Sequence, residues 1–250
     1  MTKKLIVFDQ DDTLNVTKLP IATEMAQLLT KLLDKYEVCV ISGCMYEVMK
    51  KNEPDQMINA TNKELEKLHL MPTCGAQYWR YQDDEWVRKY ANFLSEQQIK
   101  RISQALESAA KELGFWCKNP TGEIIENRGS QVTFSALGQW ALADDKHAWD
   151  PDMKKRQAIV KVIESQLPDL EIKIGGGTSI DVTLPGIDKA YGIKRLMAET
   201  GYQKAEILFI GDKLQEGGND YPVKALGVDT IAVTCWQDTA YVIRGILAVS

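Results

Sequence analysis

The chain has 250 residues, 44% of them hydrophobic and 26% charged, and its formal net charge is −5. This length suffices for one large domain or two small ones with a hydrophobic core, and the lack of a basic block argues against nucleic acid as a partner. Five scattered cysteines fit neither a disulfide framework nor a paired metal motif, which indicates a reducing cytoplasm. No apolar run reaches the length of a membrane-spanning helix, so no membrane partner is expected.

The first part of the chain alternates strand and helix signals. The apolar run LIVFD at residues 5–9 predicts a buried strand, and apolar residues at helical spacing predict a helix over residues 20–35. A second apolar run, EVCVISG at residues 37–43, predicts another strand, and CMYEVMKKN after it predicts a helix. Strands that alternate with helices are typical of βαβ units and a parallel sheet.

The last part of the chain repeats this alternation. A helix is predicted over residues 189–201, ending at Gly201, and the strand AEILFIGD follows at residues 205–212. A short helix at VKALGV, a strand at DTIAVTC and a final helix at TAYVIRGILAV complete the pattern. The two outer parts of the chain therefore predict one α/β core with a doubly wound, Rossmann-like parallel sheet.

The middle of the chain has a different pattern. Helices are predicted over residues 95–113 and 152–167, and residues 130–135 alternate apolar and polar side chains. Such alternation favours antiparallel strands with one face in water, and EIKIGGGTSIDVTLPG adds two more strand runs around a glycine turn. We therefore expect an α+β module inserted into the α/β core.

The boundaries of this module are expected where polar and turn residues interrupt the pattern. DDEWVR at residues 83–88 and TLPGID at residues 183–188 are such stretches. We accordingly expect residues 1–85 and 186–250 to form the core, and residues 86–185 to form the inserted module.

Three carboxylates, Asp9, Asp11 and Asp12, follow the first predicted strand in DQDDTL. Like charges this close repel one another, so the arrangement is costly unless a cation or a reaction requires it. Asp212 ends another predicted strand, ILFIGD, and ligands of open α/β sheets bind beyond the carboxyl ends of the strands. Asp9, Asp11 and Asp212 are therefore predicted to share a site whose oxygen ligands suit Mg²⁺.

A site of this kind predicts phosphoryl chemistry. Asp9 could act as the nucleophile toward phosphorus and form an aspartyl-phosphate, while Asp11 could protonate the leaving oxygen and then activate water. Ser42 ends the strand VCVIS and Lys189 begins a helix, so a hydroxyl and an ammonium group could hold phosphoryl oxygens.

Plainer interpretations of the same residues stay open. Asp9, Asp11 and Asp212 could be solvated turn residues or helix N-caps, although this leaves Ser42 and Lys189 unexplained. Ser42 could simply bond a backbone amide, and a lysine such as Lys189 is most often a solvated surface residue.

Two further acids have their own alternatives. Asp220, at the end of GGND, could be a metal ligand, a partner of the ligands or the N-cap of the next helix, and we favour the second role. Asp12 is expected to be a loop or capping residue.

Together these residues resemble the haloacid dehalogenase superfamily of phosphotransferases over nearly the whole chain. FDQDDT resembles its DxD nucleophile loop, ISG its serine or threonine motif, Lys189 its motif lysine and GDKLQEGGND its acidic metal motif. The insertion lies between the serine motif and the lysine, which resembles the type IIB subgroup with a large cap domain. The resemblance implies metal roles for Asp9, Asp11, Asp212 and Asp220, and catalytic roles for Asp9, Asp11, Ser42 and Lys189.

Within this subgroup the chain most resembles the eukaryotic-type phosphomannomutases. GDKLQEGGND is similar to their GDK-x-x-x-GGND segment, GGGTSIDVTLPGIDKAYGI to GGQISFDVFPDGWDK, and ENRGSQVTFSALGQ to EFRNGMLNVSPIGR. The resemblance places Ser179 and Asp181 on sugar-contacting positions and Arg128 on a phosphate-binding arginine.

Four positions depart from the family pattern. Gln139 replaces a second cap arginine, Lys146 stands where a third would fall, Lys18 replaces the arginine after the DxD loop, and Asp12 replaces a glycine. A mutase must grip a bisphosphate intermediate with a cationic cap, and lysine supplies charge without the bidentate fork of arginine. The substrate-binding set implied by the resemblance is Lys18, Arg128, Gln139, Lys146, Ser179 and Asp181.

The expected function is that of a Mg²⁺-dependent phosphohydrolase that acts on a small phosphorylated metabolite, such as a sugar phosphate, through an aspartyl-phosphate. One alternative is a phosphomannomutase or phosphoglucomutase, and another is a catalytically inactive protein that binds sugar phosphates. The expected partner is the small phosphorylated substrate, and an exposed cap sheet could also pair two copies in a homodimer.

Overall fold

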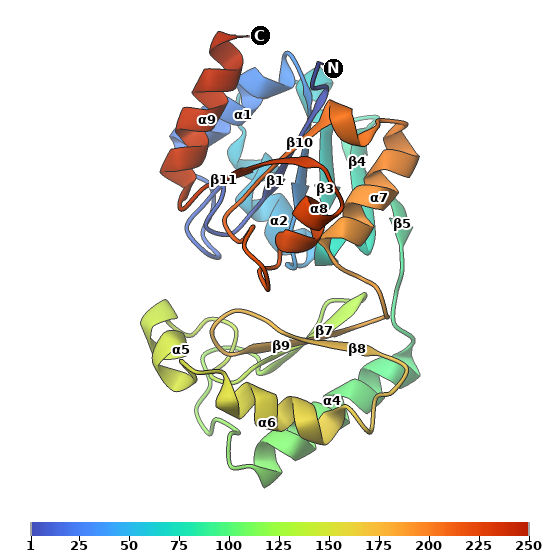
Figure 1. The fold of residues 1–250 in the computed structure, drawn as a ribbon, viewed down its shortest axis with the longest axis vertical. Coiled ribbons are helices and arrows are strands. Elements are labelled where there is room, and N and C mark those ends of the chain that lie inside the picture. The colour runs from blue at the N-terminus through green and yellow to red at the C-terminus, as the bar shows by residue number, and fades with distance from the viewer. Residues whose placement is uncertain (1, 250) are drawn as a thin grey trace. The chain divides into compact units, whose positions relative to one another are not determined.

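The computed structural model describes residues 2–249, and these divide into two compact units (Figure 1). The first unit, the core, runs up to Ala91 and resumes at Ile187. The second unit, the cap, comprises Asn92–Gly186. An α/β core with an inserted α+β cap is the fold that the sequence predicts, and the structure confirms it.

The core is built on a seven-stranded sheet in the order β11-β10-β1-β2-β3-β4-β5. Its strands are β1 (Leu5–Asp9), β2 (Glu37–Ile41), β3 (Leu68–Met71), β4 (Gln77–Gln82), β5 (Glu85–Ala91), β10 (Ile207–Gly211) and β11 (Asp229–Ala232). The five strands from β11 to β3 are parallel, and β4 and β5 add an antiparallel hairpin at one edge. The carboxyl ends of β1 and β10 are therefore neighbours.

Helices cover both faces of the core sheet (Figure 1). Ile6 and Phe8 of β1 pack on the face covered by α1 (Thr23–Leu33), α2 (Tyr46–Asn52) and α9 (Trp236–Ala248). Leu5 and Val7 pack on the opposite face with α7 (Lys189–Thr200) and α8 (Tyr221–Ala225). Because successive strand residues point to opposite faces, the run LIVF supplies apolar side chains to both layers. Short helical turns complete the unit: α3 (Asn62–Leu65), η1 (Pro54–Gln56), η2 (Thr73–Gly75) and η3 (Lys204–Glu206).

The cap contains a four-stranded antiparallel sheet in the order β6-β7-β9-β8. Its elements are β6 (Ile125–Asn127), β7 (Gln131–Ser135), β8 (Glu171–Ile174), β9 (Ser179–Thr183), α4 (Glu96–Glu112), α5 (Ala143–Trp149) and α6 (Lys154–Ile163). Val132, Phe134 and Ile180 join the apolar side chains of α4 and α6 in the cap core. Thr133 and Asp181 are cross-strand neighbours that alternate with these apolar residues, so they lie on the other, polar face.

The stretch between β2 and the cap differs from the sequence expectation. DDEWVR was expected at a domain boundary, but Asp83 and Asp84 form the turn of the β4–β5 hairpin, both with positive φ. Aspartate tolerates this left-handed backbone, so a hairpin turn and a linker give the same local signal. The chain leaves the core only after Ala91.

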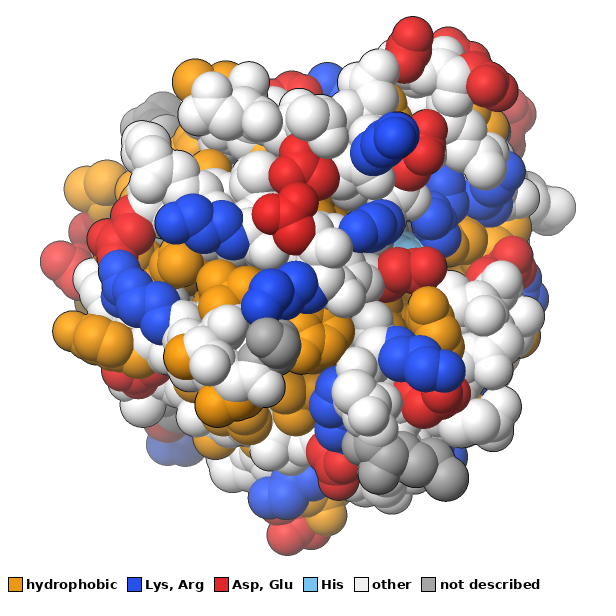
Figure 2. Space-filling model, turned by 90° about the horizontal axis from the view of Figure 1, so that it is seen from above, with side chains coloured by type: hydrophobic (Ala, Val, Ile, Leu, Met, Phe, Trp, Pro, Cys, Tyr) orange, Lys and Arg blue, Asp and Glu red, His pale blue; other side chains and the backbone are white. Residues whose placement is uncertain are grey.

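The surface seen in Figure 2 carries lysine and arginine side chains interspersed with aspartate and glutamate. None of the helices between residues 2 and 249 is both long and apolar enough to cross a membrane.

Candidate active site

The core site begins where β1 and β10 end. Phe8 pairs with Ile210 in parallel register, so Asp9 and Asp212 follow at neighbouring strand ends. Lys189 is the first residue of α7, whose N-terminus is capped by the Asp188 side chain accepting from the Tyr191 amide at 2.8 Å. Strand ends and a capped helix start therefore bring residues from three distant parts of the chain to one place.

Lys189 is the centre of this group. Its side chain is buried, and Nζ donates to Asp9 Oδ1 and, at 2.6 Å, to Asp220 Oδ1. The other oxygen of Asp220 accepts from the Lys213 amide at 3.0 Å, while Lys213 Nζ lies 2.8 Å from Asp212 Oδ2. Lys189 is therefore a buried, paired lysine, and the interpretation of it as a solvated surface residue is wrong.

Asp220 reaches the group because Gly211 has no side chain. A Cβ at Gly211 would collide with Asp220 Oδ2 and with the ring of Phe209. Asp220 also lies at the N-cap position of α8, but its side chain makes no capping bond there. Its carboxylate is committed to Lys189 and the Lys213 amide instead.

The residues present fit a divalent metal ion. One oxygen each from Asp9, Asp212 and Asp220 lie within 4.8 Å of one another, and Asp212 Oδ1 is buried with no hydrogen-bond partner among the described residues. Carboxylate oxygens are the ligands that Mg²⁺ prefers. Asp11 is not a member of this acidic group, and its predicted role as a ligand stays a prediction.

Burial sets the electrostatics of the group. Burial raises the pKa of Asp9, the Lys189 ammonium lowers it in part, and the Asp220 charge raises it further, with a net pKa of about 7. Burial lowers the pKa of Lys189, but Asp9 and Asp220 more than offset this, so its net pKa is raised and it stays protonated. Further positive charge near Asp9 would favour the carboxylate form that a nucleophile needs.

Asp11 lies in the loop after β1. Its Oδ1 accepts from the Lys18 amide at 2.7 Å. Burial raises its pKa, and this hydrogen bond offsets the effect only in part. A carboxyl group with a raised pKa can carry a proton to a leaving oxygen, as the predicted acid role requires.

Asp12 and Ser42 have local partners. Asp12 has a φ of 61°, a conformation that suits the glycine of the family pattern, and its Oδ1 accepts from the Thr17 hydroxyl at 2.7 Å. Ser42 is buried, and its Oγ accepts from the Cys44 amide at 3.2 Å. This matches the plain interpretation of Ser42 and leaves its hydroxyl hydrogen able to donate to a phosphoryl oxygen.

Glu53 is a buried acid that the sequence did not mark. It follows α2, is fully buried, and neither carboxylate oxygen has a hydrogen-bond partner among the described residues. Burial, and then the charges of Asp11 and Asp9, raise its pKa well above the ordinary value. Its neighbours in the sequence, KKNEPD, are polar and predict an exposed loop. The burial of Glu53 therefore could not be predicted from the sequence.

The predicted cap residues form a second group. Arg128 Nη2 donates to Glu126 Oε2 at 2.8 Å, and the two residues are two positions apart in the chain. With its amide nitrogen facing Glu126, Gln139 donates to both Glu126 oxygens at 3.0 Å and accepts from Trp140 Nε1 at 3.0 Å. Glu126, which the sequence also did not mark, is therefore the shared partner of Arg128 and Gln139.

The other cap candidates lie nearby on the same unit. Lys146 Nζ donates to the Gln139 carbonyl oxygen at 2.9 Å. Asp181 Oδ1 accepts from Gln131 Nε2 and Thr133 Oγ1, both at 2.8 Å, and Ser179 begins the same strand. Burial raises the pKa of Asp181, and the charge of Arg128 offsets part of this rise.

The parallel sheet, the carboxylates at its strand ends and the inserted α+β cap define a protein of the haloacid dehalogenase class. Residues 25–249 match the sequence model of the family described as eukaryotic phosphomannomutase, and the chain belongs to that family. It is a phosphomannomutase-like enzyme of this superfamily.

Named relatives share about a quarter of their residues with this chain. Phosphomannomutase 2 of Dictyostelium discoideum is 26% identical over 224 residues, which cover 88% of this chain and 86% of the relative. The phosphomannomutase of Saccharomyces cerevisiae is 25% identical over 233 residues, covering 88% and 84%.

Solved structures show the same fold at lower identity. An N-terminally truncated IMP-nucleotidase of Plasmodium falciparum matches with a TM-score of 0.72 at 16% identity, over 100% of this chain and 71% of that one. A haloacid dehalogenase-like hydrolase from Bacteroides thetaiotaomicron matches with a TM-score of 0.64 at 17% identity, over 98% and 100%.

Proposed function

We propose that this protein is a Mg²⁺-dependent phosphohydrolase that acts on a sugar phosphate through an aspartyl-phosphate on Asp9. Asp9, Asp212 and Asp220 would hold the metal, with Asp11 as a further candidate ligand. Bound Mg²⁺ would neutralise charge between Asp9 and the phosphoryl oxygens. The remaining chemistry belongs to residues of this chain.

Asp9 attacks phosphorus, and the bond from phosphorus to the sugar oxygen breaks. Asp11 gives its proton to that oxygen, and the resulting Asp11 carboxylate takes a proton from the water that attacks the aspartyl-phosphate. Lys189 donates to Asp9 and Asp220, and its third ammonium hydrogen can bind a phosphoryl oxygen, with the Ser42 hydroxyl as a second donor.

The net charge of the cap group is the observation that favours hydrolysis over phosphoryl transfer back to a sugar. The Glu126 carboxylate accepts hydrogen bonds from both the Arg128 guanidinium and the Gln139 amide. The net charge of these three side chains is therefore zero. An arginine at position 139 would leave one positive charge. We therefore expect this group to bind a second phosphate more weakly. Lys18 and Lys146 supply positive charge, but without the bidentate geometry of arginine.

Phosphomannomutase activity is the second candidate. The family match and the names of the relatives favour it. Arg128 and Lys146 still offer positive charge for a distal phosphate, and both activities share the same core chemistry. A catalytically inactive binding protein is less favoured, because Asp9, Asp11 and Lys189 are all retained.

The two activities differ in their products. Mannose 1-phosphate, supplied with mannose 1,6-bisphosphate as activator and Mg²⁺, is expected to give mostly inorganic phosphate and little mannose 6-phosphate. Phosphate and hexose 6-phosphate are measured separately in the same reaction. Efficient formation of mannose 6-phosphate with little phosphate released would make the mutase the primary activity.

The cellular setting and assembly are part of the same proposal. The five cysteines, at positions 39, 44, 74, 117 and 235, are all free thiols, which supports a reducing compartment such as the cytoplasm. A homodimer through the cap stays a prediction, which the mass of the protein in solution would decide.

A further inference from the structure

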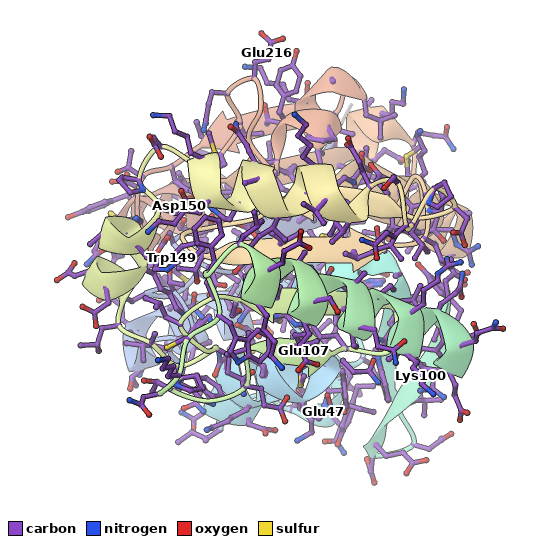
Figure 3. The ribbon with its side chains drawn as sticks, turned by 90° about the horizontal axis from the view of Figure 1, so that it is seen from below. Glu47, Lys100, Glu107, Trp149, Asp150 and Glu216 are labelled. Atoms are coloured by element: carbon purple, nitrogen blue, oxygen red, sulfur yellow. The ribbon has the colours of Figure 1, made fainter. Side chains whose placement is uncertain are left out.

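A buried ion pair lies in the cap outside the predicted site. Asp150 and Arg156 are 2% and 4% exposed, and Arg156 Nε donates to Asp150 Oδ2 at 2.8 Å. Arg156 Nη2 also donates to the Asp150 carbonyl oxygen at 3.1 Å. In Figure 3, Asp150 lies between the end of α5 and the start of α6.

The Asp150 carboxylate also starts α6. Met153, at the N-cap position, has a left-handed backbone with φ of 60° and no capping side chain. The Asp150 side chain caps the helix instead. Its Oδ1 accepts from the Lys155 amide at 3.0 Å, and its Oδ2 accepts from the Arg156 amide at 3.1 Å. The carboxylate therefore joins the end of α5 to the first turn of α6.

The third nitrogen of Arg156 reaches the β8–β9 turn. Nη1 donates to the Gly175 carbonyl oxygen at 2.8 Å. The turn itself is closed by hydrogen bonds from the Gly175 amide to the Ser179 carbonyl and from the Ser179 amide to the Gly176 carbonyl, both at 2.9 Å. One planar guanidinium thus fixes the end of α5 relative to the turn that leads into Ser179 and Asp181.

The turn and α5 also touch directly. Gly177 has a φ of 52°, and a Cβ there would lie only 3.1 Å from Lys146 Cβ on α5. On the other side of the turn, a Cβ at Gly175 would lie 3.1 Å from Asp181 Oδ2. Lys146, Ser179 and Asp181, all predicted to bind substrate, are therefore carried by two elements that Asp150 and Arg156 hold together.

Stability alone is a weak reason for such a pair. Burying two charges has a desolvation cost, and apolar side chains of similar volume often stabilise a fold as well or better. The pair does provide fixed geometry, because each of its five hydrogen bonds is directional and four of them involve a backbone atom.

We propose that Asp150 and Arg156 are positioning residues that set Lys146 at a fixed place relative to Ser179 and Asp181. This role rests on the proposed function, in which those three residues bind the substrate, Ser179 and Asp181 at its sugar and Lys146 through its charge. Asp150 and Arg156 act through them and do not touch the substrate.

Arg156→Lys tests the role, because lysine keeps the charge but has one nitrogen in place of the three with which Arg156 contacts Asp150 and Gly175. We expect KM for mannose 1-phosphate to rise about 10-fold or more, since displaced binding groups lose affinity steeply. Turnover of p-nitrophenyl phosphate, which has no sugar, should stay within about 2-fold of the wild type. Asp150→Asn, which keeps the carbonyl oxygen but loses the charge, should act in the same direction.

The matched control is Asp152→Asn in the same segment. Asp152 pairs with Lys154 at 2.7 Å, but both side chains are more than half exposed. This variant should leave both substrates unchanged. Equal losses on both substrates in the folded Arg156→Lys and Asp150→Asn variants, or no loss in either, would overturn the positioning role.

A second measurement does not depend on activity. Hydrogen exchange of the Lys146, Gly175 and Ser179 amides should become faster together in Arg156→Lys and stay unchanged in Asp152→Asn. Unchanged exchange, or faster exchange confined to α6, would overturn the role. If the wild type hydrolyses no sugar phosphate while the three amides respond together, the proposed function fails and the positioning role stands.

Discussion

The core site and the cap group differ in how their charges are compensated. In the core, the carboxylates of Asp9, Asp212 and Asp220 meet two lysines, Lys189 and Lys213, so negative charge is in excess. In the cap, the Glu126 carboxylate is matched by a guanidinium and an amide. A bound cation would neutralise the excess negative charge of the core group, whereas the charges of the cap group already cancel.

This difference separates two kinds of role. An incompletely compensated cluster at strand ends is suited to chemistry, because a metal ion and a phosphoryl group can complete it. A balanced network of hydrogen bonds on a sheet face is suited to distinguishing hydroxyl patterns, because any ligand must match existing donors and acceptors. Substitutions in the core should therefore abolish turnover, and those in the cap should redirect it.

Asp9→Asn is expected to have the largest effect. The amide is a poor nucleophile, so turnover of p-nitrophenyl phosphate should fall by about 10⁴-fold or more. Phosphate release by the purified, folded variant is the measurement. Substantial residual turnover would remove Asp9 from the nucleophile's role and would make the core cluster structural.

Asp11→Asn should slow the reaction by about 10²–10⁴-fold, the usual contribution of general acid–base catalysis. The loss should be greater for an alkyl phosphate, whose leaving oxygen needs a proton, than for p-nitrophenyl phosphate. The two substrates are compared under the same conditions. Equal losses on both would argue against protonation of the leaving group by Asp11.

Asp212→Ala tests the excess negative charge directly. Removing one of three carboxylates should raise the Mg²⁺ concentration needed for half-maximal turnover by about 10- to 100-fold, with a smaller change in KM for substrate. Titration of Mg²⁺ into chelator-treated protein is the measurement. An unchanged requirement for Mg²⁺ would show that the acidic group does not bind the ion.

Gln139→Arg should change the net charge of the cap group of Glu126, Arg128 and residue 139 from zero to +1. A charged hydrogen bond to phosphate is worth about 1.5–3 kcal/mol, or roughly one to two decades in binding. We expect the ratio of hexose 6-phosphate to inorganic phosphate to rise by about 10-fold, because a bisphosphate is held longer. Gln139→Lys, which adds charge without a fork, should give a smaller rise. No change in either variant would mean that cap charge does not decide the outcome.

The proximity of Asp9 and Asp212 could be predicted because its sequence signal is local. LIVF and ILFIG are apolar runs that are each followed directly by an aspartate, and parallel strands bring such ends together. The β4–β5 hairpin was missed because its polar turn, Asp83 and Asp84, gives the same signal as a domain boundary.

The partners of the cap residues could not be predicted in the same way. Glu126 meets Arg128 and Gln139 only through the local course of β6 and the loop after β7, which no spacing rule specifies. Arg156 has the pattern of an ordinary surface residue on a basic helix, and its burial depends on Asp150 and Gly175. Long-range packing decides these contacts.

A further expected effect concerns stability rather than turnover, and it also separates core from cap. His69, in β3, is fully buried, with Nε2 2.7 Å from Glu37 Oε2 and Nδ1 2.8 Å from the Tyr78 hydroxyl oxygen. Burial lowers its pKa to about 4; the Glu37 hydrogen bond offsets this in part, and the Arg80 charge adds to it. The ring is therefore neutral in the folded core.

Between pH 6.5 and 4 the unfolded chain binds a proton at His69 that the folded chain does not, so stability should fall as the pH falls. The loss is at most about 3 kcal/mol by pH 4, and the lowered pKa of Glu37 acts in the same direction at the acidic end. Urea unfolding at several pH values measures it. His69→Gln should flatten the profile over this range, whereas His147→Gln, on the exposed side of α5 in the cap, should leave it unchanged. Equal flattening by both variants would contradict a core-specific origin, because the buried His69 ring must release its proton in order to fold.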